Sequence, residues 1–514
     1  MKDTMHTRRS FLKTAGSLAA AWTLGGSLKR SLGSASSEPV SESKQPNIVF
    51  ILADDMGYGD VQALNPQSRI PTPHLNRLAS EGVVFTDAHS GAAVCTPTRY
   101  GVVTGRYCWR SWLKRGVLNG YSPHLIDPER LTVADVMKRS GYHTACIGKW
   151  HLGMDLPVTK QDGQQSIDHT TPIENGPNAL GFDYYFGVTA SLDMPPYAFV
   201  ENDHFPKPVT AKYQKTDFPN YSRAGLMAAD FSHEKALDQL TQKAVDYIDA
   251  RSKETKPFFM YFPLTAPHKP CLPAERFRGN TKLGDYGDFV TQVDWVVGRI
   301  DEALKANGLA DNTLLFYTSD NGSYMNRWDE DQPDHVAKPS VQGFHPTHHQ
   351  ANYIWRGTKA DIWEGGHHMP YLVRWPGVVR PGAKCDETIC LTDLMATCAE
   401  ITGFRLPTDA AEDSFSIVPL MQGKDWPTQR APVIHHSASG MFSLREGQWK
   451  MVFGNGSGGR QKPRGKPFEK PYFLFDLEKD PSETANVIEA HPEIAQRLTE
   501  RLEAIMDSGR SRPL

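Results

Sequence analysis

Two pairs of polar residues stand directly after apolar runs that have the character of buried strands. Residues 47–53 form one continuous apolar, β-branched run, and residues 314–319 form another. Each pair taken singly is also typical of a turn or a helix cap. If the strands are neighbours in an open α/β sheet, however, their carboxyl ends would bring together three carboxylates and an amide oxygen, which suit Ca²⁺ or Mg²⁺. The predicted metal ligands are Asp54, Asp55, Asp320 and Asn321.

A possible nucleophile stands in the segment Cys95-Thr96-Pro97-Thr98-Arg99. A cysteine close to a proline is, on its own, more often a small buried residue beside a turn. The segment becomes informative through the other ionisable residues that accompany it in the chain.

Several of these ionisable residues also follow predicted strands. Lys149 and His151 come just after the strand predicted at 144–148, and residues two apart on an extended backbone face the same side. His268 stands just beyond the apolar run 258–262. Side chains at the ends of neighbouring strands could line one pocket, although surface positions are an equally simple reading of a lone Lys-x-His.

Four motifs in this order resemble those of type I sulfatases, in the alkaline-phosphatase superfamily. Residues 95–99 match Cys-x-Pro-x-Arg, and residues 149–153, Lys-Trp-His-Leu-Gly, are similar to the second signature of the family. Residues 356–366 resemble its Arg-Gly-x-Lys and Glu-Gly-Gly element, and residues 480–486 its closing motif. The resemblance runs from about Pro46 to the end of the chain.

The resemblance implies that Cys95 is oxidised to formylglycine (3-oxoalanine) before folding. The hydrated aldehyde would attack sulfur, with one Ca²⁺ at the four predicted ligands, and a covalent sulfate would then be expelled. The resemblance also implies roles for other residues. Arg99 would hold the hydrate, His151 would remove a proton from it, and His268 would protonate the leaving alcohol. Lys149 and Lys359 would bind sulfuryl oxygens, and Ser191 would contact the sulfate.

The fold class expected from strand and helix patterns is α/β. The resemblance implies a large, mixed, mostly parallel sheet sandwiched by helices, as in alkaline phosphatase, and the short C-terminal strand patterns predict a smaller antiparallel sheet with one helix. Helices are predicted at 72–81, 131–139, 285–305 and 492–506, and C-terminal strands at 433–434, 449–453 and 473–477. The predicted domains are a twin-arginine signal peptide at 1–35, a linker at 36–45, a catalytic domain at 46–417 and a C-terminal α+β subdomain at 418–514.

Targeting and composition bound the function further. Arg8 and Arg9 precede an apolar run at 15–28 that is too short to span a bilayer, so we expect export by the twin-arginine translocase to the periplasm or medium, without stable membrane insertion. That route carries folded chains, so a formylglycine-generating enzyme would act in the cytoplasm. A net charge of −3 argues against a nucleic-acid partner. The seven cysteines show no zinc-like pair, and buried free thiols are expected.

Two other functions share these motifs. A phosphate or phosphonate ester hydrolase of the same superfamily would use similar site chemistry, and an inactive exported carbohydrate-binding protein could use the same scaffold. We expect a sulfated carbohydrate or aryl sulfate as substrate. Its leaving group would be bound by the polar, His-containing loop at 323–350 together with His435, His436 and Trp449, whose rings could stack on a sugar or equally be packing residues.

Overall fold

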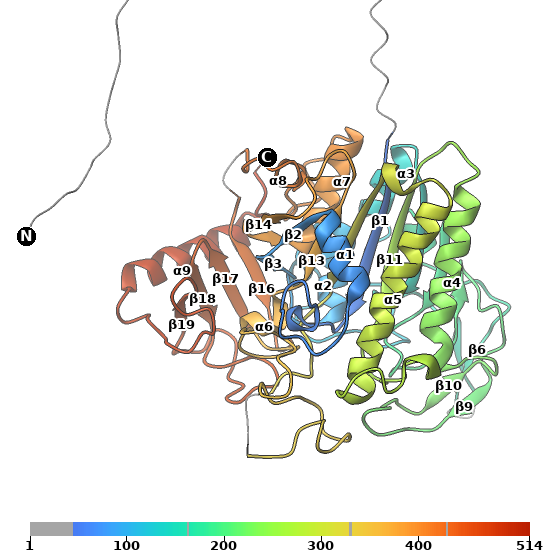
Figure 1. Ribbon diagram of the computed structural model, residues 1–514, viewed down its shortest axis with the longest axis horizontal. Coiled ribbons are helices and arrows are strands. Elements are labelled where there is room, and N and C mark those ends of the chain that lie inside the picture. Colours follow the sequence, from blue (N-terminus) through green and yellow to red (C-terminus); the bar gives the residue numbers. More distant parts are fainter. Residues whose placement is uncertain (1–44, 162–163, 328–330, 428–429, 514) are drawn as a thin grey trace, which may run out of the picture. The chain divides into compact units, whose positions relative to one another are not determined.

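The computed structural model describes residues 45–161, 164–327, 331–427 and 430–513 (Figure 1). The predicted signal peptide and all but the last residue of the predicted linker lie outside the described residues. In the described part of the chain, no helix is both long enough and apolar enough to cross a membrane.

A nine-stranded sheet forms the centre of the described unit. Its order is β14-β2-β13-β12-β1-β11-β4-β7-β8, and five of the eight strand pairs are parallel. This confirms the predicted mixed, mostly parallel sheet. The strands in that order are β14 (Ala383–Cys385), β2 (Val83–Phe85), β13 (Tyr371–Arg374), β12 (Thr313–Ser319), β1 (Asn47–Asp54), β11 (Phe258–Pro267), β4 (His143–Lys149), β7 (Tyr184–Val188) and β8 (Val200–Glu201).

Helices cover both faces of this sheet, and alternate residues of β1 point into the two resulting cores. Ile48, Phe50 and Leu52 pack with α2, α3 and α7, whereas the residues between them pack with α1, α4 and α5. Figure 1 shows α4 and α5 running side by side against the sheet. The helices are α1 (Pro73–Glu81), α2 (Cys95–Thr104), α3 (Val133–Arg139), α4 (His233–Arg251), α5 (Gly284–Ala306), α6 (Glu364–His367), α7 (Leu394–Thr402), α8 (Val418–Met421) and α9 (Pro492–Asp507).

The C-terminal part forms a four-stranded antiparallel sheet that packs with α9, as predicted. Its strands are β16 (Val433–His436), β17 (Phe442–Glu446), β18 (Trp449–Phe453) and β19 (Phe473–Asp476). Sequence reasoning missed β17. The remaining strands form two-stranded pairs, β3 (Ala88–His89) with β15 (Ile389–Cys390), β5 (Val158–Gln161) with β6 (Gln164–Ile167), and β9 (Ala211–Tyr213) with β10 (Gly225–Met227).

The predicted helices at 72–81, 131–139, 285–305 and 492–506 are confirmed as α1, α3, α5 and α9. Thr132 caps α3, since its hydroxyl accepts from the backbone N–H of Asp135 at 3.1 Å. The α2 helix was not predicted from the sequence. All of its residues are buried, so it lacks the polar face that produces a 3.6-residue hydrophobic period. All seven cysteines are free thiols, six of them buried.

Candidate active site

The two predicted metal-binding pairs meet at one end of the central sheet. In the parallel register of β1 with β12, Ala53 is opposite Ser319, so the residues that follow each strand are neighbours. The backbone N–H of Asp55 donates to Asp320 Oδ1 at 3.1 Å, and Asn321 Nδ2 donates to Asp55 Oδ1 at 2.7 Å. The strand-end prediction is therefore correct in placing the four side chains together.

The donor set fits a hard cation. Asp54, Asp55, Asp320 and Asn321 are all at most 1 % exposed, and each offers oxygen. Asp54 Oδ1 and Asn321 Oδ1 are buried without a hydrogen-bond partner, and Arg99 Nη2 lies 3.7 Å from Asp54 Oδ1. Buried polar atoms normally have a partner, so these two oxygens suit a bound cation. The residues present therefore fit the calcium ion that the family resemblance implies.

Three cations surround these carboxylates. Lys149 Nζ lies 2.7 Å from Asp54 Oδ2 and Lys359 Nζ lies 2.5 Å from Asp55 Oδ1. Burial alone would raise the pKa of Asp54, but Lys149 and the other nearby cations hold it well below its usual range. Because three cations balance three carboxylates, an added divalent ion would make the site attractive to an anionic ester.

Arg99 is fully buried and fixes two of the elements that form the site. Its Nε and Nη2 donate to Asp320 Oδ2 at 3.0 and 2.8 Å, and its Nη1 donates to the carbonyl oxygen of Lys149 at 3.0 Å. Burial and the repulsion of Asp54 raise the pKa of Asp320 to about 6 in spite of this pair. Arg99 thus joins α2 to the ends of β12 and β4. Its predicted contact with a formylglycine hydrate stays a prediction.

Cys95 is the first residue of α2, after Val94 as the N-cap. The thiol is 2 % exposed, and burial raises its pKa although Lys149 and Lys359 act to lower it. An unmodified cysteine here would be a poor nucleophile, because the thiolate is the reactive form. The two lysines and the helix N-terminus nevertheless place positive potential next to residue 95. The position suits a group that develops negative charge.

His151 offers a free basic nitrogen inside the site. Its Nε2 lies 2.8 Å from the carbonyl oxygen of Leu118, which can only accept, so the proton is on Nε2. Nδ1 then carries the lone pair, and it is buried without a partner. Burial and Lys149 hold the pKa of His151 well below its usual range. The backbone at His151 has φ +57°, so it is not extended as the two-residue spacing assumed.

His268 follows β11 and faces the carboxylates that are predicted to bind metal, and its catalytic role stays a prediction. Its Nδ1 donates to the carbonyl oxygen of Lys269 at 2.6 Å, and Nε2 lies 3.6 Å from Asp55 Oδ2. Burial and the charge of Lys359 lower the pKa of His268 to about 4. In the ligand-free protein His268 is therefore neutral at pH 7, with an accepting nitrogen turned toward the site.

Comparison with known proteins agrees with this geometry. A family model described as Sulfatase matches residues 46–404. An N-acetylgalactosamine-6-O-sulfatase of Bacteroides thetaiotaomicron is 33 % identical over 508 residues, covering 90 % of this chain and 93 % of the relative. The chain belongs to the sulfatase family. It is a sulfuric ester hydrolase, and members of its family generally use formylglycine.

This sulfatase is also similar to a human relative and to a solved structure. Steryl-sulfatase of Homo sapiens is 28 % identical over 520 residues, covering 85 % of this chain and 83 % of the relative. A solved structure named for the metabolism of multiple glycosaminoglycans by Bacteroides thetaiotaomicron has a TM-score of 0.77 and 32 % identity, covering 90 % of this chain and 99 % of its own.

Two sequence-based expectations about substrate contacts meet a different outcome. His435 and His436 are fully buried, so they cannot stack on a sugar; the ring of His435 instead stacks on His367 with centroids 3.8 Å apart. Trp449 packs against His491 and the α9 core. Ser191 is buried with its hydroxyl unpartnered, and its contact with sulfate stays a prediction.

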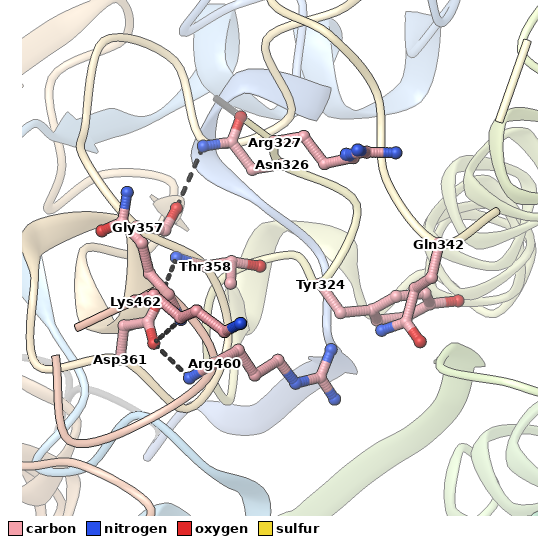
Figure 2. A pocket seen from close by; sticks show the side chains of 10 residues that line it. Tyr324, Asn326, Arg327, Gln342, Gly357, Thr358, Asp361, Arg460 and Lys462 are labelled. Carbon is pink, nitrogen blue, oxygen red and sulfur yellow. Dashed lines mark hydrogen bonds between the residues drawn. The ribbon is translucent and has the colours of Figure 1, made fainter. Parts of the chain in front are cut away.

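The sulfatase has an open cavity of about 750 Å³ beside these groups (Figure 2). Sequence reasoning identified one wall, from the loop that begins at Ser323, but missed the other, which comes from the Gly/Lys/Pro-rich loop between β18 and β19. The density of basic residues in that loop was the available signal. Ten residues line the cavity: Tyr324, Asn326, Arg327, Gln342, Gly357, Thr358, Asp361, Arg460, Gln461 and Lys462.

Proposed function

We propose that this sulfatase releases inorganic sulfate from a sulfated carbohydrate, using formylglycine made from Cys95 and one Ca²⁺ held by Asp54, Asp55, Asp320 and Asn321. One observation carries the proposal: two carboxylate-bearing strand ends, the start of α2 and three buried cations converge on one point. Around that point, two oxygens and one histidine nitrogen are buried without partners. Such a set suits binding of a cation and an anionic, hydrolysable ester.

The nucleophile would stand at the start of α2. Formylglycine at position 95 supplies a hydrated aldehyde, whose hydroxyl attacks sulfur. Calcium, when bound, supplies positive charge that holds a sulfate oxygen and acidifies the attacking hydroxyl. Lys149 and Lys359 would stabilise the negative charge that builds on the sulfuryl oxygens, since both ammonium groups are already positioned by Asp54 and Asp55.

Two histidines would move protons at opposite sides of the reaction. His151 Nδ1 carries a lone pair and can take the proton from the second hydroxyl of the hydrate, which expels sulfate and restores the aldehyde. His268 would protonate the leaving oxygen through Nε2. A bound sulfate ester places negative charge beside His268, which raises the pKa of that imidazole from about 4 and allows it to gain the proton.

A carbohydrate leaving group is supported by the relative of 33 % identity, which acts on an N-acetylgalactosamine 6-sulfate and matches along 93 % of its length. The cavity beside Lys359 is large enough for at least one sugar unit. The Arg8-Arg9 segment supports export by the twin-arginine translocase to the periplasm or medium, after a formylglycine-generating enzyme has acted in the cytoplasm.

The first experiment expresses the chain with a formylglycine-generating enzyme and examines the tryptic peptide that ends at Arg99 by mass spectrometry. We expect an aldehyde at Cys95, sulfate release from an aryl sulfate and from a sulfated saccharide, and much slower turnover of the matching aryl phosphate. Cys95→Ala should be inactive. A persistent thiol, with a known sulfatase converted in the same cells, would overturn the mechanism. Turnover of aryl esters alone across a broad saccharide panel would overturn the substrate class.

A further inference from the structure

The cavity beside the catalytic groups is predominantly basic. Arg327, Arg460 and Lys462 line it, and Asp361 is the one carboxylate among its ten lining residues. Arg327 comes from the loop after β12, whereas Arg460 and Lys462 come from the loop between β18 and β19. The catalytic part and the C-terminal part of the chain thus both contribute cations to the same space.

The oxygens of Asp361 accept hydrogen bonds from backbone N–H groups rather than from the cationic side chains of the cavity. Oδ1 accepts from the N–H of Arg460 at 2.5 Å and of Gln461 at 3.0 Å, and Oδ2 accepts from the N–H of Thr358 at 3.0 Å. Asp361 therefore holds the floor of the cavity together. Among the described residues, neither Arg460 nor Lys462 forms a salt bridge through its side chain.

The basic cavity is directly joined to the catalytic residues. Thr358, on its floor, precedes Lys359 in sequence. Tyr324, on its wall, lies edge-on to the ring of His268 with centroids 6.4 Å apart, and its hydroxyl donates to the carbonyl oxygen of Pro267 at 3.2 Å. Figure 2 shows the side chain of Arg460 extending through the cavity toward Tyr324.

A glycine on each side of the cavity allows close packing. A Cβ at Gly459 would lie 2.3 Å from the carbonyl oxygen of Ala360, and one at Gly343 would lie 2.2 Å from Cγ of Arg327. Gly343 also has φ +137°. The backbone is therefore arranged so that the arginine-bearing loop packs directly onto the segment that carries Lys359.

We propose that this cavity is a subsite for a second anionic group on the leaving side of the substrate, either a uronate carboxylate or another sulfate on the sugar next to the ester that is cleaved. The inference rests on the proposed carbohydrate sulfatase function and specifies its substrate as a polyanionic saccharide. The planar guanidinium of Arg460 suits bidentate binding of a carboxylate or sulfate, and Lys462 adds charge at the more exposed edge.

The test compares kcat/KM for an uncharged aryl sulfate and for three saccharides: a neutral monosulfated disaccharide, its uronate form and its form with a second sulfate. We expect wild-type enzyme to prefer one of the charged disaccharides, and Arg460→Gln to reduce that preference, relative to the aryl sulfate, about tenfold. The charged disaccharide whose preference is lost in Arg460→Gln shows whether the subsite binds a carboxylate or a second sulfate. Arg464→Gln is the matched control, since Arg464 is an exposed arginine of the same loop outside the cavity.

Binding to the unconvertible Cys95→Ala variant separates this proposal from the proposed reaction. The charged disaccharide should bind by calorimetry and should lose about tenfold in affinity when Arg460→Gln is added, with a smaller loss for Lys462→Gln. If wild-type enzyme releases no sulfate but this binding difference is present, the proposed function fails and the subsite stands. If the charged and neutral disaccharides are affected equally, or neither is affected, the subsite is overturned.

Discussion

Two buried ionic clusters in this sulfatase use similar residues in different ways. The catalytic cluster consists of Asp54, Asp55, Asp320, Arg99, Lys149 and Lys359. The junction cluster lies where α6 and β3 meet the C-terminal sheet, and consists of Asp87, His89, Glu364, His367, Lys450 and Glu483.

The junction cluster has a single central cation. Lys450 Nζ lies 3.0 Å from Glu364 Oε1, 2.8 Å from Glu483 Oε1 and 3.1 Å from His367 Nε2. One ammonium group cannot offset two buried carboxylates, so one of them tends to keep a proton. Burial, reinforced by Glu364, raises the pKa of Glu483 to about 7 despite the attraction of Lys450. The charge of Lys450 and its two carboxylates is therefore balanced by a proton.

The catalytic cluster has one cation for each carboxylate and still leaves Asp54 Oδ1 and Asn321 Oδ1 without a partner. Its lysines and arginine match its carboxylates in number, and its unpartnered oxygens suit the proposed metal ion. The clusters are therefore distinguished by their charge balance, because Glu364 Oε1 and Glu483 Oε1 of the junction cluster also lack a hydrogen-bond partner. A cluster balanced by its own proton instead joins two parts of the fold.

The largest stability effect is expected at the junction cluster. Lys450→Met should lower the free energy of unfolding by about 3–5 kcal/mol, because it leaves Glu364 and Glu483 buried without a cation. Urea unfolding measures the change, and Lys138→Met, which removes a partly exposed cation paired with Asp183, is the control with a much smaller effect. Equal stability of the two variants would mean that the junction cluster is not held by Lys450.

The matching change in the catalytic cluster should mainly affect activity. Lys149→Met is expected to lower kcat/KM for an aryl sulfate by about 10²–10³-fold, as for the loss of one preorganised charge at a transition state. Stability with calcium present should fall less than in Lys450→Met, since the bound ion would also offset Asp54. Unchanged turnover, or a stability loss as large as that of Lys450→Met, would contradict the distinction between the clusters.

Sequence reasoning located the catalytic cluster because its residues follow local rules. Asp54 and Asp320 follow apolar runs that are predicted as strands. In open α/β sheets, ligand sites form at the carboxyl ends of the strands, so these two residues are expected to lie close together. Lys359 lies 304 residues from its partner Asp55, and only the family motif pointed to it. No periodicity in the chain links those two positions.

The junction cluster was not foreseen, for the same physical reason. His435, whose ring stacks on His367 of the junction cluster, is predicted from the sequence either to stack on a sugar or to pack, and its burial follows from the packing of the C-terminal sheet against α6. That packing is a long-range contact without a local pattern. Arg460 was also missed. It lies in a loop rich in Gly, Lys and Pro, and such a composition does not show that the loop forms a wall of the cavity.

Removal of calcium should affect variants of the two clusters differently. A chelator is expected to abolish sulfate release and to lower the free energy of unfolding by roughly 3 kcal/mol if calcium was present at about 100 times its dissociation constant. Lys450→Met should lose the same increment as wild type, whereas Lys149→Met should lose more, because Asp54 would then have neither the lysine nor the ion. Restored melting temperature on adding calcium back is the check, and equal losses in all three proteins would argue against metal binding at Asp54.

The last expected effect is a dependence of stability on pH. Because the pKa of Glu483 is raised from 4.5 to about 7 in the folded protein, the folded state binds the proton more tightly than the unfolded chain. The contribution of this group to stability is therefore complete below about pH 4.5 and is lost as pH rises through 7, a change on the order of 3 kcal/mol for this group taken alone. Glu483→Gln should flatten the dependence of unfolding free energy on pH over that interval, measured by urea unfolding at fixed calcium. If the slope of unfolding free energy against pH is unchanged in Glu483→Gln, the proton is bound elsewhere than on Glu483. That result would remove the contrast between a cluster balanced by a proton and one with a proposed metal site.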